Sequence, residues 1–195
     1  MAKSSRTGKK IRETKETKIV IELDLDGKGS FAVNTSVGFL DHMLGTISKH
    51  SLIDLKVEAE GDLTHHIVED VAITLGETID KTLGDRKGIK RFGYALVPMD
   101  DALARVVLDV GGRPYSILRL NTDLKEIEGL PVEDLEHFFR SFSQSLKINL
   151  HAEVLYGEND HHKIEAIFKG LALALREALS IDSKKNEIPS TKGVL

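Results

Sequence analysis

The stretch HHIVEDVAITLGETIDKTL, residues 65–83, returns later in the chain as HHKIEAIFKGLALALREAL, residues 161–179. In both stretches apolar residues recur at the spacing of one helical face, and each stretch opens on a pair of histidines. A repeat of this length indicates that a structural unit has been duplicated. The sequence therefore predicts two related halves, each ending in a long helix that is apolar on one side.

The segments in front of these two helices follow one common order. Alternating apolar and polar residues predict strands, and an apolar period of three to four predicts one more helix in each half. The elements expected in the first half are strands 18–25 and 30–33, helix 38–50, strand 54–60 and helix 65–83. Those expected in the second half are strands 104–110 and 115–120, which should pair, helix 132–145, strand 147–155 and helix 161–179. The sequence therefore predicts an α+β protein with internally duplicated ββαβα halves and a sheet packed against a layer of four helices.

The domain organisation follows from the same repeat. Residues 1–10 belong to a basic run and are predicted to form a flexible N-terminal tail. No low-complexity linker separates the halves, so residues 11–188 are expected to form a single domain from two repeats, about 11–90 and 91–182. Residues 189–195 are predicted to be a C-terminal tail.

The composition excludes several classes of protein. With 195 residues, of which 41% are hydrophobic and 30% charged, the chain is typical of a soluble globular protein. Its net charge of −4 argues against a general nucleic-acid binder. Neither a signal peptide nor a membrane span is recognisable, so we expect a cytoplasmic protein without a membrane partner. Because the chain has no cysteine, any metal must be held by imidazole and carboxylate groups.

The His-His pairs predict metal sites. His65 and Glu69 are four residues apart and point the same way on a helix, whereas His66 lies about 100° from His65 and must face another direction. Adjacent histidines of this kind suit two metals, or one metal and the site of a neighbouring subunit. A further histidine follows a leucine and an acidic residue upstream of each pair. The predicted ligands, which favour Mn, Fe, Co, Ni or Zn, are His42, His65, His66, Glu69, His137, His161, His162 and Glu165.

A competing interpretation is that these histidines lie on the surface by chance. For a single His-His pair that is the better interpretation, but two matching copies, each with its upstream histidine, favour metal binding. The two remaining histidines, His50 and His151, have no counterparts in register. Core and substrate-facing roles both remain open for them.

Several motifs of the chain resemble those of the imidazoleglycerol-phosphate dehydratase family. The resemblance runs from the Arg12-Glu13-Thr14 segment to the C-terminus, and its motifs occur in the family's order. They are Leu40-Asp41-His42-Met43-Leu44, His65-His66 with Glu69-Asp70, Arg91-Phe92-Gly93, Asp109-Val110-Gly111-Gly112-Arg113-Pro114-Tyr115, the second histidine cassette, and Pro189-Ser190-Thr191-Lys192-Gly193. Two departures concern loops: Gly61–Thr64 is shorter than usual and lacks a customary acidic residue, and Ser51 stands where glycine is expected.

The resemblance implies a fold, a reaction and an assembly. The fold would be ribosomal protein S5 domain 2-like. The reaction would be that of a hydro-lyase, a carbon–oxygen lyase that dehydrates D-erythro-imidazole glycerol phosphate to imidazole acetol phosphate in histidine biosynthesis. Two divalent ions per active site, with manganese as the family precedent, would grip both ring nitrogens and favour an imidazolate and then a diazafulvene-like intermediate. The assembly would be a homo-oligomer of 24 subunits with metal sites between neighbours.

The resemblance also assigns roles to residues outside the metal cassettes. Glu13 would be the catalytic acid/base, although from the sequence alone it is a solvated surface glutamate. The planar guanidinium groups of arginines and the ammonium group of a lysine suit the phosphate group of the small-molecule substrate. The residues implied for phosphate or substrate binding are Arg91, Arg113, Ser190, Thr191 and Lys192, with His50 and Lys169 as further candidates. Residues 189–195 would thus be a substrate-binding tail.

Two other classes of function are compatible with paired His/Glu sites. A dinuclear metallohydrolase would use the same ligands to activate a water molecule. A metal-storage or structural oligomer would need the ligands alone, which leaves Arg91, Arg113 and the 190–192 segment without a purpose.

Overall fold

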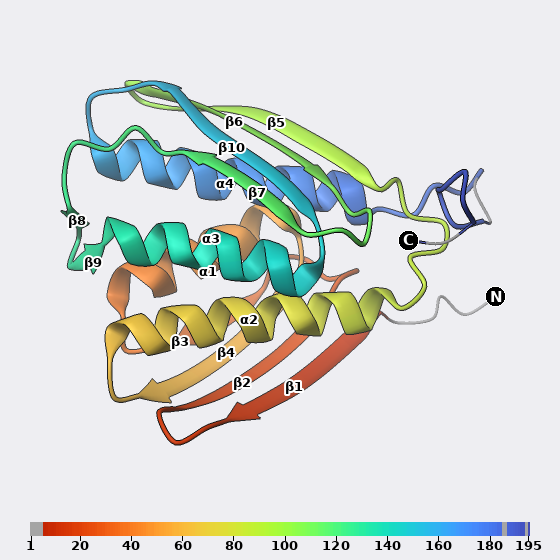
Figure 1. Cartoon of the computed structure of the whole chain (residues 1–195), viewed down its shortest axis with the longest axis horizontal. Coiled ribbons are helices and arrows are strands. Elements are labelled where there is room, and N and C mark those ends of the chain that lie inside the picture. Colours follow the sequence, from red (N-terminus) through yellow and green to blue (C-terminus); the bar gives the residue numbers. More distant parts are fainter. Residues whose placement is uncertain (1–5, 185–186, 194) are drawn as a thin grey trace.

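Four helices lie between two four-stranded sheets in the computed structural model, which describes residues 6–184, 187–193 and 195 (Figure 1). The first half consists of β1 (Thr7–Glu13), β2 (Thr17–Asp24), β3 (Phe31–Asn34), α1 (Gly38–Ser51), β4 (Asp54–Gly61) and α2 (Thr64–Leu83). The second consists of β5 (Phe92–Met99), β6 (Ala102–Asp109), β7 (Tyr115–Arg119), β8 (Glu126–Ile127), β9 (Leu130–Pro131), α3 (Val132–Leu146), β10 (Asn149–Tyr156) and α4 (Asp160–Leu179).

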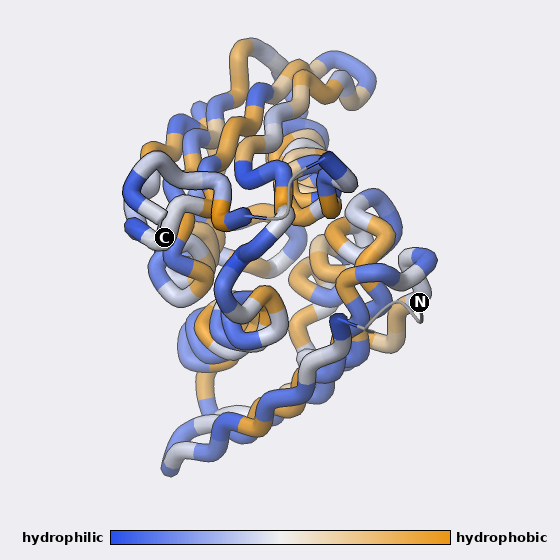
Figure 2. The backbone as a smooth tube through the Cα atoms, turned by 90° about the vertical axis from the view of Figure 1, so that its right-hand side faces the viewer, coloured by the Kyte–Doolittle hydropathy of each residue, from blue (hydrophilic) through white to orange (hydrophobic). Residues whose placement is uncertain are grey.

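The two large sheets have the same topology, one in each half. Their strand orders are β1-β2-β4-β3 and β5-β6-β10-β7, with the last pair of each sheet parallel and the other pairs antiparallel. Seen along the helices, one sheet lies above them and the other below (Figure 2). The predicted α+β class, the internal duplication and the packing of sheet against helices are confirmed.

The predicted pairing of strands 104–110 and 115–120 is wrong. β7 pairs in parallel with β10, with Tyr115 opposite Asn149, and β10 separates it from β6. The reason is the helix α3 between β7 and β10: a strand that returns to the same sheet after a helical crossover runs parallel to the strand before it.

Each half also has a first strand that the sequence did not predict. In the first half it is β1, so the predicted flexible tail of residues 1–10 is wrong for residues 7–10; residues 1–5 lie outside the described residues. The basic side chains of this strand are paired. Lys10 lies 3.2 Å from Glu77 and Arg12 lies 2.7 Å from Asp70, both carboxylates being on α2. A charged edge strand held by a helix therefore resembles a solvated tail in sequence.

The missed strand of the second half, β5, has an inverted pattern. Its large side chains, such as Phe92 and Tyr94, are exposed, while its small residues face the helices. Gly93 lies so close to α4 that a Cβ atom would clash with the carbonyl oxygen of Ala174. Because the residues on its inner face are small, β5 packs directly on the α4 backbone.

The core joins the two halves. α2 packs against α3 and α1 packs against α4, so each helix pair combines both halves. The buried rings of Phe138, Phe139, Phe142 and Phe168 lie in this shared core, with the Phe139 and Phe168 centroids 4.8 Å apart. This cross-half packing brings the start of each cassette helix beside a helix of the other half. None of the helices in the described part of the chain has an apolar stretch of the length a membrane crossing needs.

Candidate metal centre

Two clusters of possible metal ligands lie at the starts of α2 and α4. The α2 cluster consists of His65, Glu69 and His137, and the α4 cluster consists of His161, Glu165 and His42. In each cluster the three residues offer nitrogen or oxygen atoms that all lie within 4.8 Å of one another. The two clusters occupy matching positions in the duplicated fold.

Each cluster takes residues from both halves of the chain. His65 and Glu69 share a face of α2 because they are four residues apart, and His137 reaches them from α3. His42 precedes the first cassette in sequence, yet its Nε2 atom lies 3.5 Å from Glu165 Oε2 in the second half. The exchange follows from the packing of α2 on α3 and of α1 on α4.

The second histidine of each pair faces away from its own cluster. His66 Nδ1 lies 2.8 Å from Asp62 Oδ1, and His162 Nδ1 lies 2.6 Å from Asp101 Oδ1. These hydrogen bonds raise the pKa of both histidines and hold the pKa of the Asp101 carboxyl well below its usual range. His66 and His162 therefore point away from the clusters on their own helices, and the remaining ring nitrogen of His162, Nε2, lies 3.5 Å from Asp100 Oδ2.

Carboxylates also hold the first histidine of each pair. His65 Nδ1 lies 2.5 Å from Asp134 Oδ1, and His161 Nδ1 lies 3.2 Å from Glu128 Oε1. An imidazole whose Nδ1 donates to a carboxylate has its Nε2 fixed as a lone-pair donor, the usual arrangement behind a metal-bound histidine. The sequence reasoning missed all of these partners. Only Asp62, four residues before His66, gave a local signal, since the others come from distant elements.

The donor sets fit a divalent transition ion. Two imidazoles and one carboxylate in each cluster match the ligand preferences of these ions and leave coordination positions open. Burial raises the pKa of Glu165, but hydrogen bonds from Lys169 and His42 outweigh it, and the net pKa is below the ordinary value. The Glu165 carboxylate is therefore anionic at neutral pH, as a ligand of a divalent ion would need to be. Hollows of about 580 Å³ beside His161 and about 480 Å³ beside His65 and His137 leave room for a ligand.

Two of the further candidate residues lie near the α4 cluster. Lys169 Nζ lies 2.8 Å from Glu165 Oε1 and 3.0 Å from Met99 Sδ. His50, at the end of α1, has its pKa lowered by burial and by the neighbouring charge of Lys169. The other histidine outside the cassettes, His151, is exposed on β10 and so is not a core residue.

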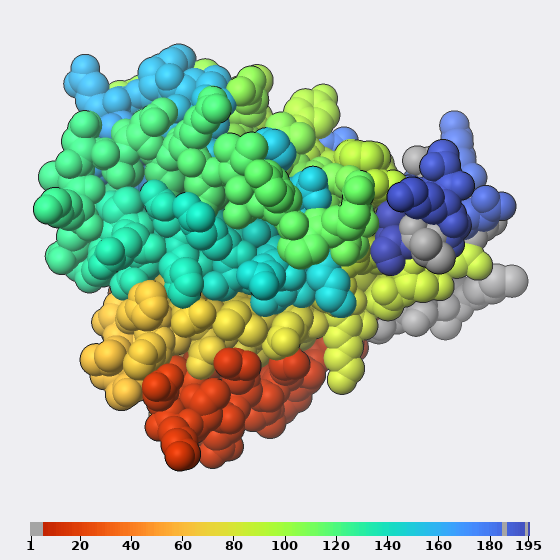
Figure 3. Space-filling model, viewed as in Figure 1, coloured from red at the N-terminus to blue at the C-terminus, as the bar shows by residue number. Residues whose placement is uncertain are grey.

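The candidate phosphate residues gather at the opposite end of the helices. Arg91 donates to Asp109 through Nε and Nη2, and its Nη1 donates to the Pro189 carbonyl oxygen at 2.7 Å. Its backbone amide donates to Ala178, near the end of α4, which the helical rise places about 25 Å from His161. The C-terminal residues project from this end of the molecule (Figure 3).

The remaining candidate phosphate residues lie at the same end of the molecule. Arg113 follows Gly112, against which the C-terminal Leu195 lies, and Ser190 Oγ accepts the Lys192 amide at 3.2 Å. Thr191 stands between them and is exposed. The structure thus brings these residues near one another, and it separates them from both clusters of the same chain.

Glu13 also lies apart from both clusters in a single chain. It is the last residue of β1, and its neighbour Arg12 points to Asp70 on α2. Because successive side chains of a strand alternate, Glu13 points to the exposed face of the sheet.

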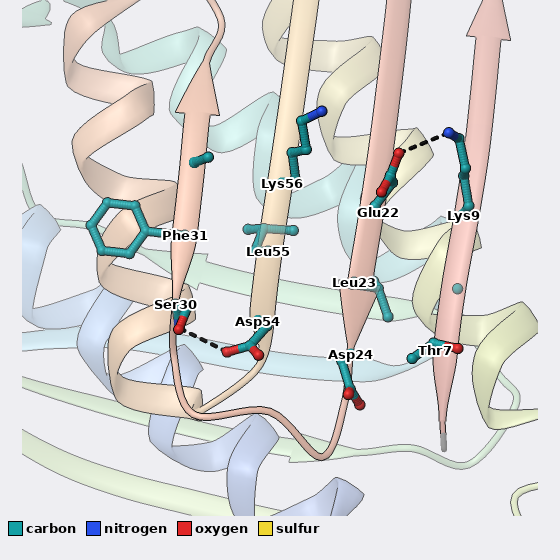
Figure 4. A pocket seen from close by; sticks show the side chains of 12 residues that line it. Thr7, Lys9, Glu22, Leu23, Asp24, Ser30, Phe31, Asp54, Leu55 and Lys56 are labelled. Carbon is teal, nitrogen blue, oxygen red and sulfur yellow. Dashed lines mark hydrogen bonds and ion pairs between the residues drawn. The ribbon is translucent and has the colours of Figure 1, made fainter. Parts of the chain in front are cut away.

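A further hollow, of about 750 Å³, lies over the sheet of the first half (Figure 4). It contains none of the predicted site residues. Its lining charges are already satisfied, since Lys9 pairs with Glu22 at 2.7 Å and Asp54 accepts from the Ser30 amide at 2.8 Å. The histidine clusters, and not this hollow, are therefore the candidate site.

The chain is similar in sequence to the members of one enzyme family. The family model of imidazoleglycerol-phosphate dehydratase matches residues 35–175. The enzyme of that name from Methanothermobacter thermautotrophicus is 52% identical over 193 residues, which cover 97% of this chain and 98% of the relative. That of Chlorobium phaeovibrioides is 48% identical over 195 residues, covering 98% of this chain and 96% of the relative.

Solved structures of the same family have a similar fold. The crystal structure of the Staphylococcus aureus enzyme superposes with a TM-score of 0.83 at 36% identity, covering 90% of this chain and 99% of that one. The Pyrococcus furiosus enzyme in complex with (S)-C348 gives a TM-score of 0.83 at 38% identity, covering 95% and 100%.

Proposed function

Because the chain belongs to the imidazoleglycerol-phosphate dehydratase family, we propose that it dehydrates D-erythro-imidazole glycerol phosphate to imidazole acetol phosphate, a step of histidine biosynthesis. The observation that carries the proposal is the matched make-up of the α2 and α4 clusters. Each has two imidazoles and one carboxylate, at equivalent places in the two halves. A substrate ring with two nitrogen donors calls for two such sites.

In this proposal the two clusters hold two divalent ions per active site, and manganese is the ion we propose. Bound ions would supply Lewis acidity to the substrate's imidazole and stabilise the negative charge that the ring carries before the hydroxyl departs. The chain's own residues position the reactants and move the proton. Glu13 takes the proton from the carbon adjacent to the one that carries the departing hydroxyl, so that a proton and a hydroxide are lost as water, while Arg113, Ser190 and Lys192 bind the phosphate.

We propose that each active site is completed by a neighbouring copy of the chain. The substrate is a single ring on a three-carbon phosphate, far shorter than the about 25 Å that separate His161 from the Arg91 end of α4. His66 and His162 also face outward from their own clusters. A homo-oligomer, of 24 subunits in our proposal, would place the phosphate residues of one chain beside the metal ligands of another, at the subunit interface.

The experiment that tests the function is an assay with the proposed substrate. Metal-loaded protein should convert imidazole glycerol phosphate to the acetol product, followed by mass spectrometry. A dinuclear metallohydrolase would instead release inorganic phosphate, and a metal-storage protein would leave the substrate unchanged. Either outcome would contradict the proposed reaction.

Deleting residues 189–195 is expected to raise KM for the substrate strongly, with a smaller effect on kcat. The reason is that the segment carries Ser190 and Lys192 and is tethered at Pro189 to Arg91. Steady-state kinetics of the truncated and full-length chains measure the effect. An unchanged KM would show that the tail does not hold the phosphate.

Removing divalent ions is expected to dissociate the assembly into smaller units, since ligands from two chains would then lose their common ion. Light scattering before and after chelation, and again after manganese is restored, measures the mass. A mass that stays constant through chelation would contradict metal-bridged subunits.

A further inference from the structure

We propose that the two metal sites differ in affinity, with the α2 cluster binding its ion first and more tightly because Asp134 positions His65. This inference rests on the proposed function, since it takes the two clusters to be metal sites. It concerns the residues around the clusters, where the two halves of the chain are no longer alike.

The first difference lies three residues before each upstream histidine. In the second half this position is Asp134, on α3 ahead of His137, and its carboxylate lies 2.5 Å from His65 Nδ1. In the first half it is Phe39, on α1 ahead of His42, and its ring lies 5.3 Å from the ring of His161. A buried carboxylate at one cluster is thus replaced by a buried aromatic ring at the other.

A carboxylate behind a ligating histidine fixes the ring's orientation and strengthens its nitrogen as a donor, and losing it costs about 10–100-fold in metal affinity. Among the residues that the structure describes, His161 has Glu128 alone in this role, at 3.2 Å. The Glu128 side chain is 61% exposed, whereas that of Asp134 is 5% exposed. Water competes for an exposed carboxylate and salt screens it, so Glu128 is the weaker partner.

The second difference lies four residues after each cluster glutamate. On α4 this residue is Lys169, whose ammonium group lies 2.8 Å from Glu165 Oε1 and occupies that oxygen. On α2 the corresponding residue is Ile73, which carries no charge. A cation in contact with the ligand carboxylate repels a bound ion and weakens the α4 cluster.

Two features act in the opposite direction. In the α2 cluster, the Nδ1 atom of His137 is buried and has no hydrogen-bond partner among the described residues. The hollow beside His161 is lined by acidic side chains, including Glu126 and Glu158, which attract cations. Both are exposed, and charges in water are screened beyond about 8 Å at physiological salt. The direct contacts of Asp134 and Lys169 therefore decide the order of affinity.

Manganese titration of the full chain tests this inference, with free Mn²⁺ followed by electron paramagnetic resonance. We expect two classes of site in equal number, separated by at least about tenfold in affinity. Asp134→Asn, which keeps the shape of the side chain, should lower the manganese affinity of the tight class by about 10–100-fold. It should leave the affinity of the weak class unchanged. Lys169→Ile, which copies α2, should tighten only the weak class.

Glu133→Gln is the matched control, because it removes the same charge from the neighbouring position on α3, and it should leave the tight class unchanged. Two sites of equal affinity, or an Asp134→Asn variant that weakens both classes alike, would overturn the inference while leaving the proposed function intact. A chain that binds no manganese at all would overturn both.

Discussion

Replacing Glu13 with glutamine is expected to lower kcat by about 10²–10⁴-fold, the range over which a positioned acid or base accelerates proton transfer. Glutamine keeps the size and the hydrogen-bonding oxygen of the side chain but cannot take up a proton. Glu13 ends β1 on the exposed face of the sheet, apart from both clusters of its chain. The variant should therefore keep its full content of bound metal, measured by elemental analysis beside the steady-state rate.

Glu60→Gln provides the control for this result. Glu60 lies on β4, and both it and Glu13 are register partners of Lys18 on β2, so the two glutamates share one exposed sheet face. The Glu60→Gln variant should retain near-normal turnover. Near-normal turnover in Glu13→Gln would exclude Glu13 as the acid/base, and a loss of metal would show that it acts on the metal sites instead.

Two inactive variants are expected to restore each other's activity when they assemble together. Glu165→Gln removes the carboxylate of the α4 cluster, and Arg113→Ala removes a proposed phosphate contact at the far end of the chain. If each site combines the cluster of one chain with the phosphate residues of another, about a quarter of the sites in an equal mixture contain both intact contributions. Co-expression with two different affinity tags, followed by purification on both, yields the mixed assembly for assay.

The control carries both substitutions in one chain, co-expressed with the unaltered chain. It should also leave about a quarter of the sites intact, so the mixed and control assemblies should have similar activity. A mixture of the two single variants that stays as inactive as its parents would contradict a shared site. It would place the phosphate contact within the same chain as the cluster.

Local spacing in the sequence predicts the parts of this site that lie on one helix. The i, i+4 relation places His65 beside Glu69, and the repeat predicts a second copy of the same arrangement. It does not predict that His42 joins the second cassette, since that depends on which helix packs on which across the two halves. For the same reason Asp134 gave no signal: its partner His65 lies on another helix, far away in sequence.

The strands also divide into those that the local sequence predicts and those that depend on the rest of the fold. Those with inward apolar residues are predicted close to their observed bounds, as for β2 and β4. β5 is missed because its exposed residues are the large apolar ones and its buried residues are small, which inverts the usual pattern. The pairing of β7 with β10 is missed because neighbours along the chain are not neighbours in this sheet. Order across a sheet is a property of the whole fold and leaves little trace in any one segment.

The exchange of histidines between the halves has a consequence for the origin of the chain. A half-length ancestor could not have completed a three-residue cluster alone, because His42 and His137 each serve the cassette of the other half. Two identical copies related by a two-fold axis would have formed two identical clusters. Once the copies were joined in one polypeptide, each position could mutate independently of the equivalent position in the other half. Asp134 and Phe39, or Lys169 and Ile73, are differences that a symmetric ancestor could not have carried.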